Sequence, residues 1–160
     1  MMRINKEEFE KTVDTYSDVM FRCAYAYCNN RTDADDIVQE AFVKYLKKSP
    51  EFEDEEHKKA WLLRVVINIS KNLVKSFWNR NKTDIDDNIP YEKGELTKCE
   101  IWEDVKRLPA KYRILVELYY GEGYTIEETA KITGVKKSTV SDRLKKAREL
   151  LEKMYKEELQ

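Results

Sequence analysis

The sequence predicts an all-α protein, built from two small helical domains joined by a flexible linker. Three observations support this fold class. Apolar residues recur at steps of three and four along most of the chain, and no segment alternates polar and apolar residues with a period of two. The chain also contains only four Gly and three Pro, so long helical stretches are rarely interrupted.

Residues 1–80 are expected to form the first domain, which begins with a helix over residues 5–28. The second helix is predicted to start at a capping box, in which the side chains of Thr32 and Asp35 satisfy free backbone N–H groups. It should end before the next Pro. Apolar spacing predicts the residues that this helix buries: Ile37, Val38, Ala41, Phe42, Tyr45 and Leu46.

A third helix is predicted from Ala60 to about Trp78, with a broad apolar face. The segment that follows, residues 81–97, is polar and acidic and carries Pro90 and Gly94. This composition predicts a flexible linker between the two domains. The apolar face of the third helix consists of Leu62, Val65, Val66, Ile69, Leu73 and Phe77.

The second domain, residues 98–160, is expected to hold four helices. Pro109 suits the first turn of the second of these helices, where its missing N–H group costs nothing. Gly121 and Gly134 are expected to end the second and third helices. Two capping candidates mark the starts of the first and third helices: Thr97 with Glu100, and Thr125 with Glu128.

The third and fourth helices of this domain show the spacing of a helix-turn-helix. Ala130, Gly134 and Val140 supply a small residue at the helix crossing, a residue free to adopt a left-handed turn, and an apolar anchor. The last helix is strongly basic, as a recognition helix in a major groove would be. A plain helical hairpin is the alternative, and the basic charge counts against it. The candidate DNA-contacting residues are Lys136, Lys137, Ser138, Thr139, Ser141, Asp142, Lys145, Lys146 and Arg148.

The third helix of the first domain has an unusual distribution of charge. Residues 57–83 contain seven cations and no acid, although the formal net charge of the whole chain is −1. Trp61, Phe77 and Trp78 are interleaved with these cations. Cations beside stacking rings favour a surface for single-stranded nucleic acid. A basic helix that docks an acidic protein remains the alternative.

Other classes of function find little support in the sequence. There is no Gly-rich phosphate loop and no zinc-protease or serine-hydrolase motif, so we expect no enzyme and no cofactor. Three cysteines without a C-x-x-C pair, and a single His57, predict reduced thiols and no metal site. No apolar run is long enough to span a membrane, and no secretory signal is present, so a cytoplasmic location is expected.

Three stretches, taken together and in this order, resemble the sigma-70 family of sigma factors, of the small extracytoplasmic-function type. Region 2.1/2.2 of the family is resembled by the stretch DADDIVQEAFVKYLKK. The regions that melt and read the minus-ten promoter element are resembled by the stretch AWLLRVVINISKNLVKS. Region 4, with its helix-turn-helix, is resembled by the stretch LPAKYRILVELYYGEGYTIEETAKITGVKKSTVSDRLKKARELL. The resemblance covers nearly the whole chain and makes residues 1–80 region 2 and residues 98–160 region 4.

The resemblance implies a bacterial sigma factor that binds core RNA polymerase, through the β′ clamp helices and the β flap, and directs promoter recognition and melting. It also implies an anti-sigma factor as a partner. By resemblance, Asp36, Gln39 and Glu40 contact the clamp helices. Asn68 stands where the family lines a pocket for a flipped base, with partial burial as the competing interpretation. The residues implied at the minus-ten element are Phe52, Trp61, Arg64, Asn68, Lys71 and Lys75.

Region 4 departs from the common family pattern at Asp142, an acid where many relatives carry Ser or a base. Asp142 could accept a hydrogen bond from a cytosine amino group, or it could cap or pair with Arg143 or Lys146.

The alternative function is a helix-turn-helix regulator that binds duplex operator DNA as a dimer without acting as a sigma subunit. That alternative does not explain the acid-free helix at residues 57–83. When free, the two domains are expected to pack together, with the acidic linker or an anti-sigma factor covering the basic faces.

Overall fold

The computed structural model describes residues 4–81 and 100–158, and no β-strand occurs within these two segments. Residues 82–97 of the predicted linker, the capping candidate Thr97 and the third cysteine, Cys99, lie outside the described residues. The helices are α1 (Lys6–Cys28), α2 (Arg31–Lys48), α3 (Glu55–Asn81), α4 (Glu100–Lys106), α5 (Ala110–Val116), a π-helical turn η1 (Glu117–Gly121), α6 (Ile126–Thr133) and α7 (Lys137–Glu158).

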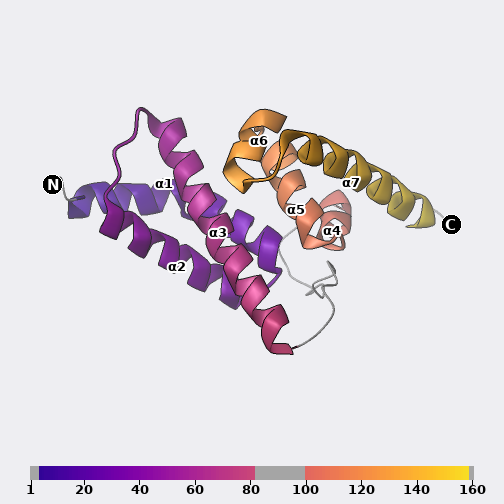
Figure 1. The fold of residues 1–160 in the computed structure, drawn as a ribbon, viewed down its shortest axis with the longest axis horizontal. Coiled ribbons are helices and arrows are strands. Elements are labelled where there is room, and N and C mark those ends of the chain that lie inside the picture. Colours follow the sequence, from indigo (N-terminus) through magenta and orange to yellow (C-terminus); the bar gives the residue numbers. More distant parts are fainter. Residues whose placement is uncertain (1–3, 82–99, 159–160) are drawn as a thin grey trace.

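The first body consists of α1, α2 and α3, each packed against the other two (Figure 1). Its core contains the fully buried side chains of Met20, Tyr45 and Leu62, together with the buried Cys23 and Cys28. Both of these cysteines are free thiols, as the sequence predicted, and burial raises the pKa of each.

The predicted capping box at Thr32 and Asp35 is wrong, because α2 begins earlier than the sequence suggested. Asn30 is the N-cap, and its side chain accepts a hydrogen bond from the backbone N–H of Asp33 at 2.9 Å. Asn29 ends α1 in the left-handed conformation, with φ of 55°. The two adjacent Asn residues therefore form the whole connection between α1 and α2.

Two other expectations for this domain also need correction. The third helix begins at Glu55 rather than Ala60, because the side chain of Asp54 accepts a hydrogen bond from the backbone N–H of His57 at 2.7 Å and caps the first turn. Leu46 was expected in the core but is 41% exposed, because it lies at the edge of the apolar face of α2. Ile37, Val38, Ala41, Phe42 and Tyr45 are buried as predicted.

The second body consists of α4, α5, η1, α6 and α7, and it contains the predicted helix-turn-helix. Thr125 and Glu128 form the predicted capping box, whose two hydrogen bonds are each 3.0 Å long. The bond that the Thr125 backbone N–H donates to the Glu128 carboxylate lowers the pKa of that carboxyl. Gly134 ends α6 with φ of 75°, a left-handed conformation in which a side chain would be strained. Val140 anchors α7 with its side chain fully buried. Pro109 is the N-cap residue of α5 rather than part of its first turn.

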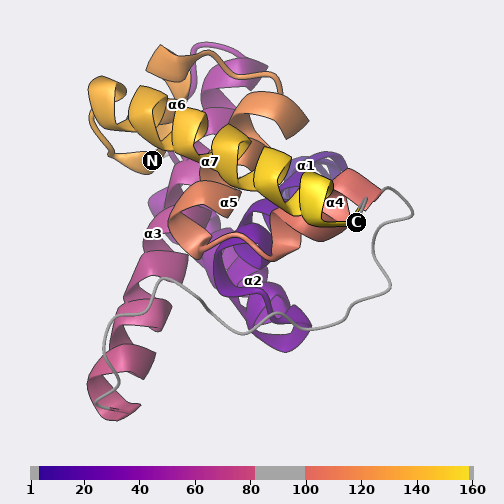
Figure 2. The same ribbon diagram turned by 90° about the vertical axis from the view of Figure 1, so that its right-hand side faces the viewer.

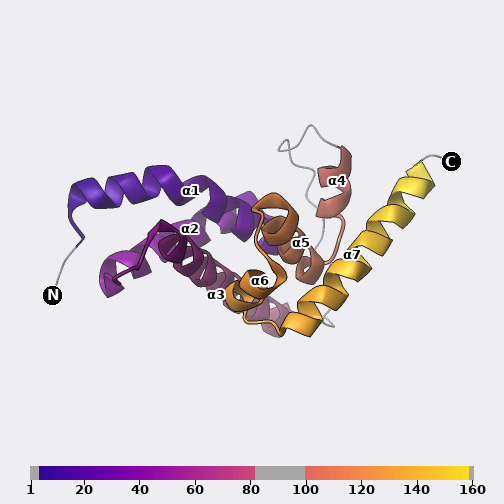
Figure 3. The same cartoon turned by 90° about the horizontal axis from the view of Figure 1, so that it is seen from above.

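The two bodies pack against each other in the described structure. The contacts run from α1 to α5 and η1, and from α3 to α6. Figure 3 shows α5 and α6 between the first body and α7, and Figure 2 shows α7 on the outer side of this assembly. Direct helix-to-helix contact agrees with the expectation that the domains pack together, while most of the acidic linker that was expected to cover the basic faces lies outside the described residues.

Candidate nucleic-acid interface

The predicted polymerase-binding residues share one solvent-facing side of α2. Asp36, Gln39 and Glu40 are all exposed, whereas Ile37 and Val38 between them are buried. The acids Asp36 and Glu40 also line a groove of about 290 Å³ between α2 and α3. The three side chains lie together, as positions three and four apart on a helix must.

The aromatic residues of the minus-ten set are partly integrated into the core. The Phe52 ring lies 5.8 Å from the Trp61 ring and 5.4 Å from the His57 ring, measured between centroids. Trp61 in turn lies 6.3 Å from the fully buried ring of Tyr45. Both Phe52 and Trp61 are half-buried, so each presents one part of its ring to solvent while the remainder is held in place.

The polar members of the minus-ten set differ in exposure along α3. Arg64, Asn68 and Lys75 are exposed, so the competing interpretation of Asn68 as a partly buried residue is not supported. Lys71 is half-buried, and its ammonium group donates a hydrogen bond to the backbone carbonyl oxygen of Thr133. Burial lowers the pKa of Lys71, and the positive charge of Arg143 lowers it further.

The contact at Lys71 joins the predicted minus-ten face to the turn of the helix-turn-helix. Thr133 is the last residue of α6, and the next residue, Gly134, begins the turn. A Cβ atom placed on Gly134 would stand 4.0 Å from the Lys71 ammonium nitrogen. The second domain therefore covers part of the α3 face that the sequence assigned to DNA.

The predicted minus-thirty-five set lies on α7 and on the turn before it. Of its nine residues, Thr139 is half-buried and the other eight are exposed. The opposite face of α7 is buried through Val140, Leu144 and Ala147. Asp142 has no ion pair among the described residues, so pairing with Arg143 or Lys146 finds no support in this arrangement.

An ionic cluster also joins the two bodies. Arg22 of α1 lies 3.5 Å from a Glu117 carboxylate oxygen and 3.2 Å from a Glu122 carboxylate oxygen. Lys59 of α3 reaches the other Glu122 oxygen at 3.5 Å. Both carboxylates are largely buried. We name these four residues, Arg22, Lys59, Glu117 and Glu122, the interdomain ionic cluster.

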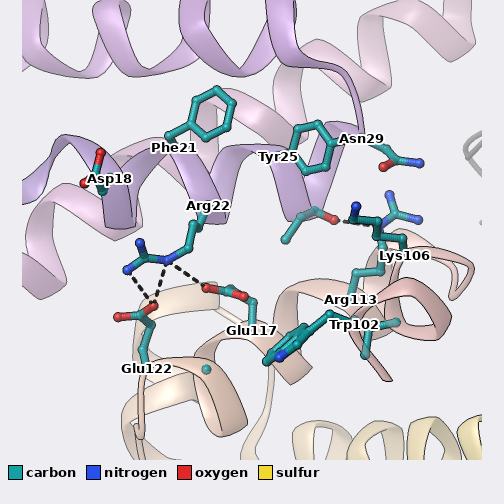
Figure 4. Close-up of a pocket in the computed structure, with 13 residues that line it drawn as sticks. Asp18, Phe21, Arg22, Tyr25, Asn29, Trp102, Lys106, Arg113, Glu117 and Glu122 are labelled. Carbon is teal, nitrogen blue, oxygen red and sulfur yellow. Dashed lines mark hydrogen bonds and ion pairs between the residues drawn. The ribbon is translucent and has the colours of Figure 1, made fainter. Parts of the chain in front are cut away.

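A cavity of about 580 Å³ adjoins this cluster. Figure 4 shows Arg22 extending from α1 toward Glu117 and Glu122, with Phe21 and Tyr25 on the α1 side and Trp102 on the α4 side. Burial raises the pKa of the Glu117 carboxyl to about 7, and its hydrogen bond with Glu122 acts in the same direction. Arg22 opposes this shift without cancelling it.

Arg113 makes the most buried charged contact between the two bodies. Its side chain is 2% exposed. Its guanidinium group donates hydrogen bonds to the carbonyl oxygens of Ala26 at 2.7 Å and Tyr27 at 3.2 Å, and also to the carbonyl of Leu108. Ala26 and Tyr27 lie in the last turn of α1, whose carbonyl groups lack partners within the helix. Arg113 thus caps a helix of the other domain, and burial lowers its pKa to about 10.

Sequence reasoning missed Arg22, Arg113, Glu117 and Glu122 as interface residues. Arg113 alone carried a signal, since it precedes Ile114 and Leu115 within an apolar helix where a charged residue needs a partner. Arg22 and Glu122 each look like ordinary residues of a solvated face.

Comparison with known proteins identifies the family. The Sigma-70 region 2 family model matches residues 12–81, and the Sigma-70, region 4 model matches residues 100–151. The chain belongs to the sigma-70 family. This agrees with the resemblance seen in the sequence, and it supports the sigma-factor interpretation rather than the alternative of a conventional operator-binding regulator.

Curated relatives include a sigma factor named as being of the extracytoplasmic-function (ECF) type. The chain is 29% identical to the RNA polymerase sigma factor SigV of Bacillus subtilis over 135 residues, which cover 82% of this chain and 81% of SigV. It is 23% identical to the ECF RNA polymerase sigma factor SigW of the same organism over 175 aligned positions, covering 96% of this chain and 91% of SigW.

Solved structures support the same fold. The sigma factor RpoE, in complex with the anti-sigma factor NepR from Bartonella quintana, aligns with a TM-score of 0.72 at 21% identity. That alignment covers 94% of this chain and 98% of the matched chain. CnrH, in complex with the cytosolic domain of CnrY, aligns with a TM-score of 0.64 at 20% identity, covering 95% and 90% of the two chains. Within the described residues, no helix has the length and apolar character needed to cross a membrane.

Proposed function

We propose that this sigma factor acts as a non-catalytic initiation subunit in the cytoplasm, where it recruits core RNA polymerase to a promoter. The domain of residues 1–80 binds the β′ clamp helices and the minus-ten element. The domain of residues 98–160 binds the minus-thirty-five element and the β flap. The linker of residues 81–97 lets the two domains separate to the spacing of the two elements.

The observation that carries this proposal is the position of the acidic face of α2. Asp36 and Glu40 point into solvent with Gln39 beside them, and within the described residues α2 makes no extensive contact with the second domain. A polymerase surface of complementary charge can therefore dock on α2 while the two domains are still packed together. Polymerase binding can then precede exposure of the DNA-binding faces.

The exposure of Asn68 supports its assignment to a flipped base of the non-template strand. An amide side chain both donates and accepts hydrogen bonds, so it can read one base edge. Phe52 and Trp61 offer ring surface nearby on the same side of the first domain, which favours stacking on bases of the melted strand.

The contact between Lys71 and Thr133 supports a closed form in which one cation of the minus-ten set, Lys71, is held by the second domain. The Lys71 ammonium group is half-buried and bonded to α6 in this form, so it is less available to DNA than in a separated form. We propose that core polymerase favours the separated form and that an anti-sigma factor favours or adds to the closed one. Free protein would then bind promoter DNA weakly.

The test is run-off transcription with core RNA polymerase on promoter fragments from the source genome. We expect addition of the purified chain to produce specific transcripts and the chain to co-purify with core enzyme.

The variants Asp36→Ala and Glu40→Arg should weaken the association with core enzyme without lowering thermal stability, because both residues are exposed. Glu10→Arg, on the exposed face of α1, is the matched control. Failure to bind core enzyme would return the operator-binding regulator as the better interpretation.

A further inference from the structure

Arg148 has a hydrogen-bond partner that none of the assignments above includes. Its guanidinium group donates a hydrogen bond to the phenolic oxygen of Tyr120 at 3.0 Å. Tyr120 lies in η1, far from Arg148 in sequence, and its side chain is 52% exposed. Both groups are at the surface, so the pair is open to a ligand from solvent.

The charge of Arg148 is not neutralised by an acid in this part of the chain. The acid one helical turn later, Glu152, forms an ion pair with Lys156 at 3.1 Å instead. Among the described residues Arg148 takes part in no ion pair. A guanidinium group that is oriented by a neutral hydroxyl keeps its full positive charge, and it presents its remaining N–H groups to an anion.

Arg148 also occupies a particular place on α7. Ser141, Lys145 and Arg148 follow one another at four- and three-residue steps, so they share one face of the helix. Leu144 and Ala147, which are buried, border Arg148 on one side. Arg148 therefore lies at the margin of the exposed face, next to η1. A residue at this margin meets the wall of a DNA groove, where the phosphates are, rather than the base edges at its floor.

The irregular backbone of η1 explains how Tyr120 comes to this position. A π-helical turn shifts the side chains that follow it relative to an α-helix, and such turns recur at functional sites. The Tyr119 ring lies 4.9 Å from the Tyr120 ring, which restricts where the phenol can move. The Tyr120 hydroxyl accepts the hydrogen bond from Arg148 and can still donate its own hydrogen.

We propose that Tyr120 and Arg148 together bind one backbone phosphate of duplex DNA at the edge of the minus-thirty-five site. The Arg148 guanidinium donates to the phosphate and supplies charge. Tyr120 holds the guanidinium in place and donates its own hydroxyl hydrogen to the same phosphate. The inference rests on the proposed role of α7 in DNA binding, and it adds Tyr120 as a contact that is independent of base sequence.

The test measures binding of the full chain to a fluorescein-labelled duplex of arbitrary sequence, by anisotropy over a series of salt concentrations. Each phosphate contact contributes about 0.9 to the slope of log K against log salt. We expect Arg148→Ala to reduce this slope by about that amount. Tyr120→Phe removes one hydroxyl and keeps the ring, and it should weaken binding about threefold at low salt. In the Arg148→Ala background, Tyr120→Phe should have a much smaller effect, because the two residues act on one phosphate.

Tyr155→Phe is the matched control, since Tyr155 is 57% exposed on the distal part of the same helix. Lys145→Ala tests the proposed function separately. If Lys145→Ala weakens binding but neither Tyr120→Phe nor Arg148→Ala does, the phosphate site is overturned while the role of α7 stands. If none of the three changes binding, both proposals fail. Independent, additive effects of Tyr120→Phe and Arg148→Ala would also overturn the shared site.

Discussion

Lys71 of α3 and Thr133 of α6 form a hydrogen bond between the two domains, from the ammonium group of the first to the backbone carbonyl of the second. Lys71 belongs to the basic helix assigned to the minus-ten element, and Thr133 ends the first helix of the helix-turn-helix. Two surfaces that are proposed to hold promoter DNA at different elements therefore contact each other. The interdomain ionic cluster and Arg113 add further contacts between the two domains.

Reversing one charge of the interdomain ionic cluster should open the protein. In Arg22→Glu, a third carboxylate would face Glu117 and Glu122, whose side chains are largely buried. We expect binding of single-stranded DNA to rise about fivefold, which corresponds to about 1 kcal/mol for a half-buried pair, because Lys71 is released. Anisotropy with a labelled oligonucleotide measures this change.

Lys6→Glu makes the same change of charge in the exposed Lys6–Glu10 pair of α1, and it should leave binding unchanged. The double variant Arg22→Glu with Glu122→Arg should return only part of the way toward the parent, because it restores the pair between positions 22 and 122 but removes the partner of Lys59. If the parent and Arg22→Glu bind single-stranded DNA with equal affinity, the interdomain ionic cluster does not control access to Lys71.

The raised pKa of Glu117 predicts that the packed arrangement depends on pH. The pKa is about 7 in the folded chain, against an ordinary value of 4.5, so between these values the folded chain binds a proton that the unfolded chain has lost. This contribution to stability is complete below about pH 4.5 and is lost as the pH rises toward 7. It should change the free energy of unfolding by at most about 1.4 kcal/mol per pH unit in that window.

Glu117→Gln keeps the shape of the protonated side chain and removes the titration. Urea unfolding at several pH values between 5 and 7 should therefore show a smaller loss of stability for Glu117→Gln than for the parent. Glu127→Gln, at an exposed position in the first turn of α6, should follow the parent. Identical pH profiles of the parent and Glu117→Gln would rule out Glu117 as the titrating group.

Replacing Arg113 should destabilise the protein through the carbonyl groups that it leaves behind. Arg113→Ala removes the donors to Ala26, Tyr27 and Leu108, and we expect a loss of about 3 kcal/mol in the free energy of unfolding. Arg107→Ala, at an exposed arginine whose ion pair with Asp104 is 3.9 Å long, should cost much less. Chemical denaturation of both variants provides the comparison, and equal losses would contradict the capping role of Arg113.

Asn68→Ala should lower open-complex formation about tenfold, on duplex promoters and on pre-melted templates alike, because the proposed contact is to the flipped base. Folding should be unaffected, since the side chain is exposed. Asn72→Ala, one helical turn later and also exposed, is the control. Permanganate footprinting of the melted region would measure the effect, and equal activity of both variants on the pre-melted template would remove Asn68 from the pocket.

Local patterns in the sequence were sufficient to predict the helices. The spacing of apolar residues located the α-helices, although α3 begins earlier than predicted, and Thr125 with Glu128 marked the start of α6 correctly. The same rule failed at Thr32, because Asn30 offers an equally good cap two residues earlier and places Asp33 at the third position. When two cap residues compete, packing of the following helix decides between them, and no local pattern contains that information.

The candidate site was predictable where exposure follows from helix periodicity, as for Asp36, Glu40 and Lys145. The contacts between the domains were not. Arg22 and Glu122 stand 100 positions apart in the chain, and a charge gives no sequence signal that it will meet an opposite charge at that distance. The pairing of Tyr120 with Arg148 was missed for a related reason, since the π-helical turn that orients Tyr120 has no sequence pattern of its own.

Both halves of the interface between the domains belong to one polypeptide. Lys71 and Thr133, like Arg113 and Ala26, therefore meet at a local concentration that is fixed by the chain itself. The fraction of molecules in the packed state should consequently be the same whether a cell holds ten copies or ten thousand. Occupancy of polymerase, by contrast, depends on copy number and on competing sigma factors. Changing the amount of this protein and changing its packed fraction are thus two independent ways to set how strongly its promoters are used.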